Sequence, residues 1–394
     1  MSRGNRTGRA ATRRRKWRRA GSLAWRVVAS LPAAVMGVGS RLGAGRTGVV
    51  AVVLLLFIVP LIAVVTWAGC GRSKRPGEFA GGKSGESAYV RLNDEIMIAG
   101  ELFHTGAPVV LWSDPGGYDG YRVEKRFAPW EESTWEAMLG AGRAPDTPNR
   151  YNVRSANLLP EELERVRGGG WDLELLRRSV DQFVLHYDVC GTSRQCFKIL
   201  HDLRGLSVHF LLDIDGTIYQ TLDVKERAWH ATTSNSRSVG IEIANMGSYP
   251  EGAPDPFDKW YQRDAQGNAL RITIPSVFGD GGVRTPNFVG RPARAGMVVG
   301  PVQGAVHRMY DLTPQQYDSL IKLTAALCTA LPNITCDYPK DELGQLITRK
   351  LPDEQLAGYR GVLGHYHIQA NKADPGPALQ WEYVITEARK RMER

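Results

Sequence analysis

The chain has 394 residues, of which 43% are hydrophobic and 23% charged, enough apolar material for one large core or two ordinary ones. This composition excludes a chain that is disordered over most of its length. The formal net charge is +9, but residues 1–75 hold 15 Lys and Arg and no Asp or Glu. The remainder carries 35 basic and 41 acidic residues, a net charge of −6. The excess of basic residues belongs to the N-terminal tail. Because the rest of the chain is mildly acidic, we expect no nucleic-acid partner.

Residues 49–69 form a run of 21 residues without a charged side chain, VVAVVLLLFIVPLIAVVTWAG. As a helix this run would be about 31 Å long, which is enough to cross the hydrocarbon of a bilayer. The basic residues before it predict that residues 1–48 are a cytoplasmic tail, because Lys and Arg stay on the cytoplasmic side of a span. Everything after residue 69 is then expected outside the cytoplasm.

Three interpretations of this segment remain open. The tail before it is longer than the basic region of an ordinary signal peptide, which favours an uncleaved anchor. Trp67-Ala68-Gly69-Cys70 also looks like a lipoprotein processing site, although Trp67 replaces the usual aliphatic residue. Ordinary cleavage of the segment is the third interpretation. Residues 70–88, rich in Gly, Ser and Lys, are predicted to be a linker.

One folded domain is predicted over residues 89–394. Its apolar runs predict strands at 96–99, 108–112, 182–187, 208–212, 217–220 and 238–244, and helices at 160–166, 172–180, 195–203 and 314–330. Strands that alternate with helices indicate an α/β sheet covered on its faces. Residues 247–308 are interpreted as a long loop inserted in this domain. Such a loop either forms a wall of a substrate groove or lies on the surface without contact to ligand.

Residue types that can bind a catalytic zinc occur in two distant parts of the chain. His186 follows an apolar run, His365 lies near the C-terminal end, and Asp374 comes nine residues after His365. Two imidazoles and a carboxylate that a fold could bring together are what a catalytic zinc uses, with the fourth position left for water. Glu242, the single acid of an alternating stretch, and Lys372 are candidates to handle protons and charge.

Together with their flanking segments, these residues resemble the zinc-dependent N-acetylmuramoyl-L-alanine amidases of the type 2 amidase and peptidoglycan-recognition-protein superfamily. The resemblance covers about residues 184–381. It implies a central mixed β-sheet flanked by helices, here preceded by a single N-terminal transmembrane helix. The segments that carry it are FVLH at 183–186, LSVHFLL at 206–212, DGTIYQ at 215–220, RAWHA at 227–231, the strand with Glu242, and the tail from His365 to Asp374.

The resemblance also implies a role for each residue. His186, His365 and Asp374 would hold Zn²⁺, Glu242 would move the proton of the attacking water, and Lys372 would face the developing oxyanion. The expected reaction cuts the amide between N-acetylmuramic acid and L-alanine in peptidoglycan or muropeptides. The expected location is the bacterial cell membrane, with the catalytic domain in the periplasm or cell envelope. The residues expected to contact substrate are His230, Trp229 and Asn245.

Some features leave alternatives open. His367 takes a place that is usually acidic in related enzymes, and the interval to Asp374 is one residue shorter than usual, so His367 is an alternative ligand. The spacing of Cys190 and Cys196 resembles that of a disulfide in animal peptidoglycan-recognition proteins. A receptor that binds muropeptide without cutting it, and a zinc endopeptidase acting on stem peptides, are the rival functions.

The charge asymmetry generates a test of topology. A reporter fused after Arg394 should be exported, and the protein should stay with membranes after a high-salt wash, because an apolar span is not released by screening charges. Recovery of the full-length chain from the soluble cytoplasm would contradict both the anchor and the envelope location. A mass increase on the fragment that begins at Cys70 would select the lipoprotein instead.

Overall fold

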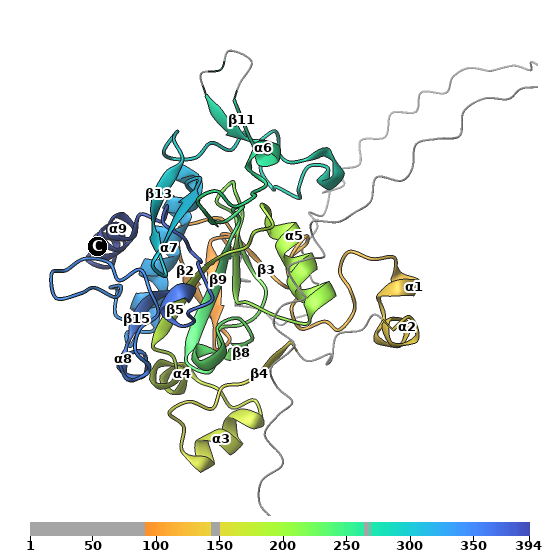
Figure 1. The fold of residues 1–394 in the computed structure, drawn as a ribbon. Coiled ribbons are helices and arrows are strands. Elements are labelled where there is room, and N and C mark those ends of the chain that lie inside the picture. Colours follow the sequence, from red (N-terminus) through yellow and green to blue (C-terminus); the bar gives the residue numbers. More distant parts are fainter. Residues whose placement is uncertain (1–90, 143–149, 264–266, 268) are drawn as a thin grey trace, which may run out of the picture. The chain divides into compact units, whose positions relative to one another are not determined.

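A six-stranded mixed β-sheet forms the centre of the domain (Figure 1), with the strand order β15-β5-β9-β6-β7-β3. The structure is a computed structural model that describes residues 91–142, 150–263, 267 and 269–394. Neighbouring strands are parallel except for β6 and β7, so the predicted central mixed sheet is confirmed. The six strands are β3 (Val109–Leu111), β5 (Gln182–Tyr187), β6 (Phe210–Leu212), β7 (Ile218–Gln220), β9 (Ser238–Ile243) and β15 (Gly361–Gly364).

Helices cover both faces of this sheet, with α7 and α9 on one side and α5 on the other (Figure 1). The alternation of strand side chains divides the core accordingly, because Phe210 and Leu212 pack with α7 while Leu211 packs with α5. Helix α7 begins at a capping box in which the Thr313 hydroxyl accepts from Gln316 N and the Gln316 side chain accepts from Thr313 N. The covering helices are α5 (Ser193–Phe197), which continues as the π-helix η1 (Lys198–Arg204), α7 (Pro314–Ala330) and α9 (Trp381–Met392).

The remaining elements surround this core. The predicted helices at 160–166 and 172–180 are present as α3 and α4, and the predicted strand at 96–99 is present as β1. The other short elements were not predicted from the sequence. The elements outside the insertion are β1 (Glu95–Ile98), β2 (Glu101–His104), β4 (Tyr151–Val153), β8 (Glu226–Ala228), α1 (Trp130–Ser133), α2 (Trp135–Gly140), α3 (Pro160–Arg167), α4 (Leu173–Ser179), α8 (Asp353–Gly358), η2 (Thr232–Ser234) and η4 (His365–His367).

The insertion at 247–308 is not the long loop that the sequence suggested. It holds a three-stranded sheet of order β10-β14-β13, a β11–β12 hairpin and a short helix. A small core of its own includes Phe257, Trp260 and Leu270. Each element is too short to produce a clear sequence period, which explains the wrong expectation. The elements are β10 (Tyr249–Pro250), α6 (Phe257–Trp260), β11 (Tyr261–Arg263), β12 (Leu270–Ile272), η3 (Ser276–Phe278), β13 (Val298–Val302) and β14 (Ala305–Met309).

The predicted cytoplasmic tail, the span at 49–69 and Cys70 lie outside the described residues. Within the described ranges, no helix combines the length and the apolar character that a membrane span needs. The membrane anchor therefore stays a prediction from the sequence.

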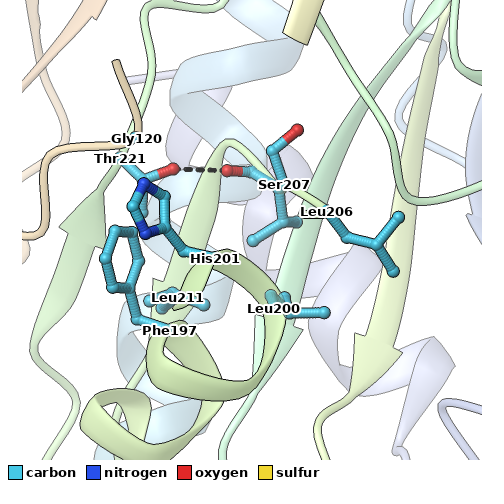
Figure 2. A pocket seen from close by; sticks show the side chains of 9 residues that line it. Gly120, Phe197, Leu200, His201, Leu206, Ser207, Leu211 and Thr221 are labelled. Atoms are coloured by element: carbon cyan, nitrogen blue, oxygen red, sulfur yellow. Dashed lines mark hydrogen bonds between the residues drawn. The ribbon is translucent and has the colours of Figure 1, made fainter. Parts of the chain in front are cut away.

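A small cavity lies between η1 and the sheet (Figure 2). Its volume is about 10 Å³, which is room for roughly one water molecule. The lining is largely apolar, with Phe197, Leu206 and Leu211 among its members. The His201 ring at its edge has partners at both nitrogens, Asp202 Oδ1 at 2.8 Å and Arg122 O at 2.8 Å. This cavity is a packing gap and contains none of the predicted site residues.

Four cysteines of the described part are free thiols that form two neighbouring pairs. The thiols of Cys190 and Cys196 are close enough to share a hydrogen bond, and so are those of Cys328 and Cys336. The predicted disulfide between Cys190 and Cys196 is therefore not formed in this structure, although the two partners lie side by side. Joining them requires an oxidant, which an exported protein meets and a cytoplasmic one does not.

In protein recovered from the envelope we expect Cys190 and Cys196 to be joined. Closing so short a loop should stabilise the fold by about 2 to 3 kcal/mol in the chain-entropy model. Peptide mapping under non-reducing conditions should show one linked species, lighter by two hydrogens than the reduced pair. Two thiols that are freely alkylated in the native exported protein would refute the disulfide.

Candidate metal centre

The candidate site lies where three neighbouring parallel strands end. His186 is the fifth residue of β5 and stands directly opposite Glu242 of β9 in the strand register. On the other side of β5, Gly364 closes β15, and His365 follows it at once. The carboxyl ends of parallel strands meet at one edge of a sheet, which is where α/β proteins place their ligands.

Three predicted ligands converge at this edge. Asp374 Oδ2 lies 2.8 Å from His186 Nδ1 and 2.9 Å from His365 Nδ1. All three residues are buried, and one donor atom from each lies within 4.8 Å of the other two. Two imidazole nitrogens and one carboxylate oxygen, gathered this closely with no fourth ligand among the described residues, fit a catalytic zinc with an open position.

The protonation states of these groups suit metal binding. Burial lowers the pKa of His186 to about 4, which keeps its ring neutral near pH 7. Burial opposes ionisation of Asp374, but the neighbouring His365 and the hydrogen bonds from both imidazoles hold the pKa of this carboxyl well below its usual range. A neutral imidazole and an ionised carboxylate are the forms that bind a metal ion.

The outer nitrogens of both imidazoles are also held. His186 Nε2 lies 3.0 Å from His230 Nδ1, and His365 Nε2 lies 2.6 Å from Gln369 Oε1. Such partners fix the tautomer and the orientation of a metal-binding imidazole, so that Nδ1 points to the centre. Gln369 was not predicted from the sequence, in which its position four residues after His365 is the only indication of this contact.

His230 is positioned by a glycine in the neighbouring strand. A Cβ added at Gly240 would lie 2.5 Å from the His230 ring, so only glycine leaves room for it. The far nitrogen of His230 lies 3.2 Å from Ser238 Oγ. The structure thus places His230 against a ligand, whereas the sequence predicted a contact with substrate, which remains untested.

The other two predicted substrate residues differ in their surroundings. The Asn245 side chain is engaged within the chain, because it donates to Tyr310 O at 3.2 Å and accepts from Gly247 N at 2.8 Å. The Trp229 indole nitrogen is buried and has no hydrogen-bond partner among the described residues. Asn245 therefore stabilises a turn beside the centre, and its predicted contact with substrate stays a prediction, as does that of Trp229.

Glu242 and Lys372 both lie within electrostatic reach of the three ligands. Burial, followed by the negative charges of Asp374 and Asp188, raises the pKa of Glu242 well above its usual range, and Lys372 opposes this rise. The charge of Lys372 also disfavours a proton on His186. Neither the carboxylate nor the ammonium has a hydrogen-bond partner in the described part of the chain, which leaves both groups available to a substrate.

His367 does not join the centre. Its Nδ1 accepts from Gly364 N at 2.8 Å, and its Nε2 lies 2.5 Å from Ile347 O. Both ring nitrogens are used by the backbone, so this residue holds the end of β15 in place. The alternative of His367 as a ligand is wrong.

Two further groups of potential ligands occur among the described residues. One consists of Asp188, Cys190 and Cys196, and the other of Asp94, Glu95 and His104. Asp188 Oδ1 already accepts three backbone N–H groups, and Asp94 pairs with the exposed His104. The group around Asp374 differs from both because two imidazoles meet one carboxylate oxygen in it, and the outer nitrogen of each imidazole has a side-chain partner.

A family model matches the part of the chain that contains this site. The model of a family described as N-acetylmuramoyl-L-alanine amidase matches residues 176–377, about half of the chain, and this range includes His186, Glu242, His365 and Asp374. No curated protein matches the chain.

Solved structures with some similarity include three chains, each 17% identical with a TM-score of 0.28. A selenomethionine derivative of AmpD is covered over 94% of its length by 62% of this chain. The endolysin N-acetylmuramoyl-L-alanine amidase LysCS from Clostridium intestinale URNW is covered over 86% by 54% of this chain. The amidase LysC from the same organism is covered over 88% by 54%.

The two roles of His230 can be separated by experiment. Replacing His230 by Ala removes the partner of His186 Nε2, so affinity for Zn²⁺ should fall by roughly 10- to 100-fold in competition with a chelator. His104→Ala, at an exposed histidine outside the centre, is the matched control. Unchanged Zn²⁺ affinity with a raised KM would instead assign His230 to the substrate.

Proposed function

The chain belongs to the N-acetylmuramoyl-L-alanine amidase family, and from this membership we propose that it is a zinc-dependent enzyme of peptidoglycan. The amide cut would be the one between N-acetylmuramic acid and L-alanine, in peptidoglycan or in muropeptides. The observation that carries the zinc dependence is the convergence of donor atoms from His186, His365 and Asp374 within 4.8 Å.

A zinc ion held by these three residues would supply Lewis acidity, which polarises the scissile carbonyl and makes water more acidic. Glu242 stands opposite His186 in the register of β5 and β9, so its carboxylate would lie near the reacting carbonyl. Its carboxylate would take the proton as the water oxygen attacks the carbonyl carbon. It would then give this proton to the alanine nitrogen as the C–N bond breaks. A raised pKa suits a group that both accepts and returns a proton.

Lys372 would stabilise the negative charge that develops on the carbonyl oxygen. Its ammonium has no competing partner among the described residues, and its charge acts on both Glu242 and His186. Fixed positive charge at the place where an oxyanion forms lowers the barrier without reorganisation. His230 would orient His186 through the contact between its Nδ1 and His186 Nε2, and Trp229 and Asn245 would contact the substrate.

The site of action that we propose is the outer side of the bacterial cell membrane. The support is the sequence alone: the basic tail at 1–48, the apolar segment at 49–69 and the linker at 70–88. The membrane would be the partner of residues 49–69, or of a lipid on Cys70, and peptidoglycan the partner of the folded domain. No described feature favours a nucleic acid.

Replacement of single groups tests this mechanism. His186→Ala, His365→Ala or Asp374→Ala should remove both zinc and activity, because three ligands leave little redundancy. Glu242→Gln keeps the shape but accepts no proton, so zinc should stay while turnover falls by roughly 10² to 10⁴. Lys372→Ala should likewise keep zinc and lose rate. The measurements are zinc content and the release of peptides with free L-alanine amino termini from purified sacculi and from soluble muropeptides.

Two outcomes of this experiment would overturn parts of the proposal. Wild-type protein that binds zinc and muropeptide yet releases no peptide would be a receptor and not an enzyme. Release of new termini other than L-alanine would identify an endopeptidase. Undiminished turnover of the Glu242→Gln protein would remove Glu242 from the mechanism.

A further inference from the structure

The tip of the β13–β14 hairpin reaches the loop that joins the two C-terminal ligands. The side-chain nitrogen of Gln303, at this tip, lies 2.9 Å from Tyr366 O, 2.9 Å from Gln369 O and 3.1 Å from Lys372 O. Three backbone carbonyls from one segment of seven residues thus converge on a single amide. Because the amide has two hydrogens, one of them is shared between two carbonyls.

Gln303 is itself held in place from the opposite direction. Its Oε1 accepts from Lys350 N at 3.1 Å, and its backbone N donates to Thr348 O at 2.9 Å. Its φ of 54° is left-handed, as the tight turn with Gly304 requires. The side chain therefore links the hairpin tip, the 348–350 segment and the loop at 366–372.

The body of the hairpin packs against the turn after Asp374. A Cβ added at Gly300 would lie 3.0 Å from Pro377 Cβ, and one added at Gly376 would lie 2.5 Å from Met309 Sδ. The two backbones approach so closely only because these positions are glycine. The hairpin thus touches the chain on both sides of the ligand Asp374.

We propose that Gln303 is a positioning residue for the metal centre, and that this hairpin of the insertion supports the ligand loop. By fixing the carbonyls of Gln369 and Lys372, Gln303 places the partner of His365 Nε2 and the cation that faces the substrate. The inference rests on the proposed zinc-dependent function for its consequence in catalysis. Its consequence for the loop holds without metal.

The physical reason is preorganisation of the loop. Without a donor at its centre, three converging carbonyls repel one another and lose their hydrogen bonds. The residues between His365 and Asp374 would then sample other conformations, and each of them would have to be ordered again when metal binds. Glutamate at 303 has nearly the same shape and keeps an acceptor for Lys350 N. It replaces the donor nitrogen by an oxygen, so it removes the hydrogen bonds to the three carbonyls and leaves the packing of the side chain nearly unchanged.

The test uses full-length wild-type, Gln303→Glu and Gln303→Ala proteins, with Gln262→Ala as the matched control. Gln262 is an exposed glutamine in β11 of the same insertion. In metal-free protein, amide hydrogen exchange of peptides covering 365–374 should be at least about tenfold faster in both Gln303 variants, while peptides covering α7 keep the wild-type rate. Zn²⁺ affinity from chelator competition should fall by roughly 10- to 100-fold, as is typical when partners of ligands are lost.

The outcomes separate this inference from the proposed function. Wild-type exchange rates over 365–374 in Gln303→Glu protein would overturn the positioning role, and so would an equal acceleration in α7, which would indicate a general loss of stability. Zinc-free wild-type protein would overturn the zinc-dependent function and leave the exchange result to decide the role of Gln303. If saturating Zn²⁺ restores the turnover of the Gln303 variants, Gln303 acts by positioning the ligands for metal binding. If kcat stays low at saturating Zn²⁺, Gln303 acts by positioning Lys372.

Discussion

The structure around the centre depends on one buried carboxylate. An ionised carboxylate away from water costs several kcal/mol unless it is paired, and Asp374 finds its pairing in the two imidazoles of His186 and His365. This pairing is possible only because β15 lies beside β5 in parallel, with Gly364 opposite Leu185, so that each histidine follows at the same height. A divalent ion between the three donors would replace these hydrogen bonds and would neutralise the charge of the Asp374 carboxylate. The order of the sheet is thus tied to the chemistry of its edge.

Close backbone approach is the second condition for this edge. A Cβ at Gly364 would lie 2.6 Å from Pro375 Cδ, and one at Gly240 would meet the His230 ring. Glycine at the end of β15 lets the turn after Asp374 fold back over the strand. Glycine within β9 makes room for the imidazole that orients His186. The geometry of the centre therefore depends on these two glycines as well as on the ligands. A larger residue at Gly364 or Gly240 would displace a ligand or its partner.

The parts that were predictable from the sequence are those with strong local patterns. The buried strand β5 and the capped helix α7 were predicted with their observed bounds, because a continuous apolar run and a 3.6-residue period are local signals. The three candidate ligands were predicted from residue type, order and family resemblance. Strand β15 has four residues with a glycine at each end, and the insertion is built from strands of two to five residues, so neither has a recognisable period. The contact of Gln369 with His365 spans only four residues, and the contacts of Gln303 are long-range, but a polar side chain in a loop gives no sequence pattern that predicts either.

The electrostatics of the centre favour a catalyst over a receptor. A binding groove gains nothing from a carboxylate and an ammonium that lie near three buried ligands and have no hydrogen-bond partner among the described residues, because a polar group shielded from water without a partner lowers the stability of the fold. Glu242 is in this position, with its pKa raised by burial and by like charges, and Lys372 stands near it. Unpaired groups of this kind are kept where a reacting group must exchange a proton, and where a cation must meet charge that appears only in the transition state. A receptor could replace both residues by neutral hydrogen-bonding groups at no loss of affinity for a neutral amide, whereas an amidase could not.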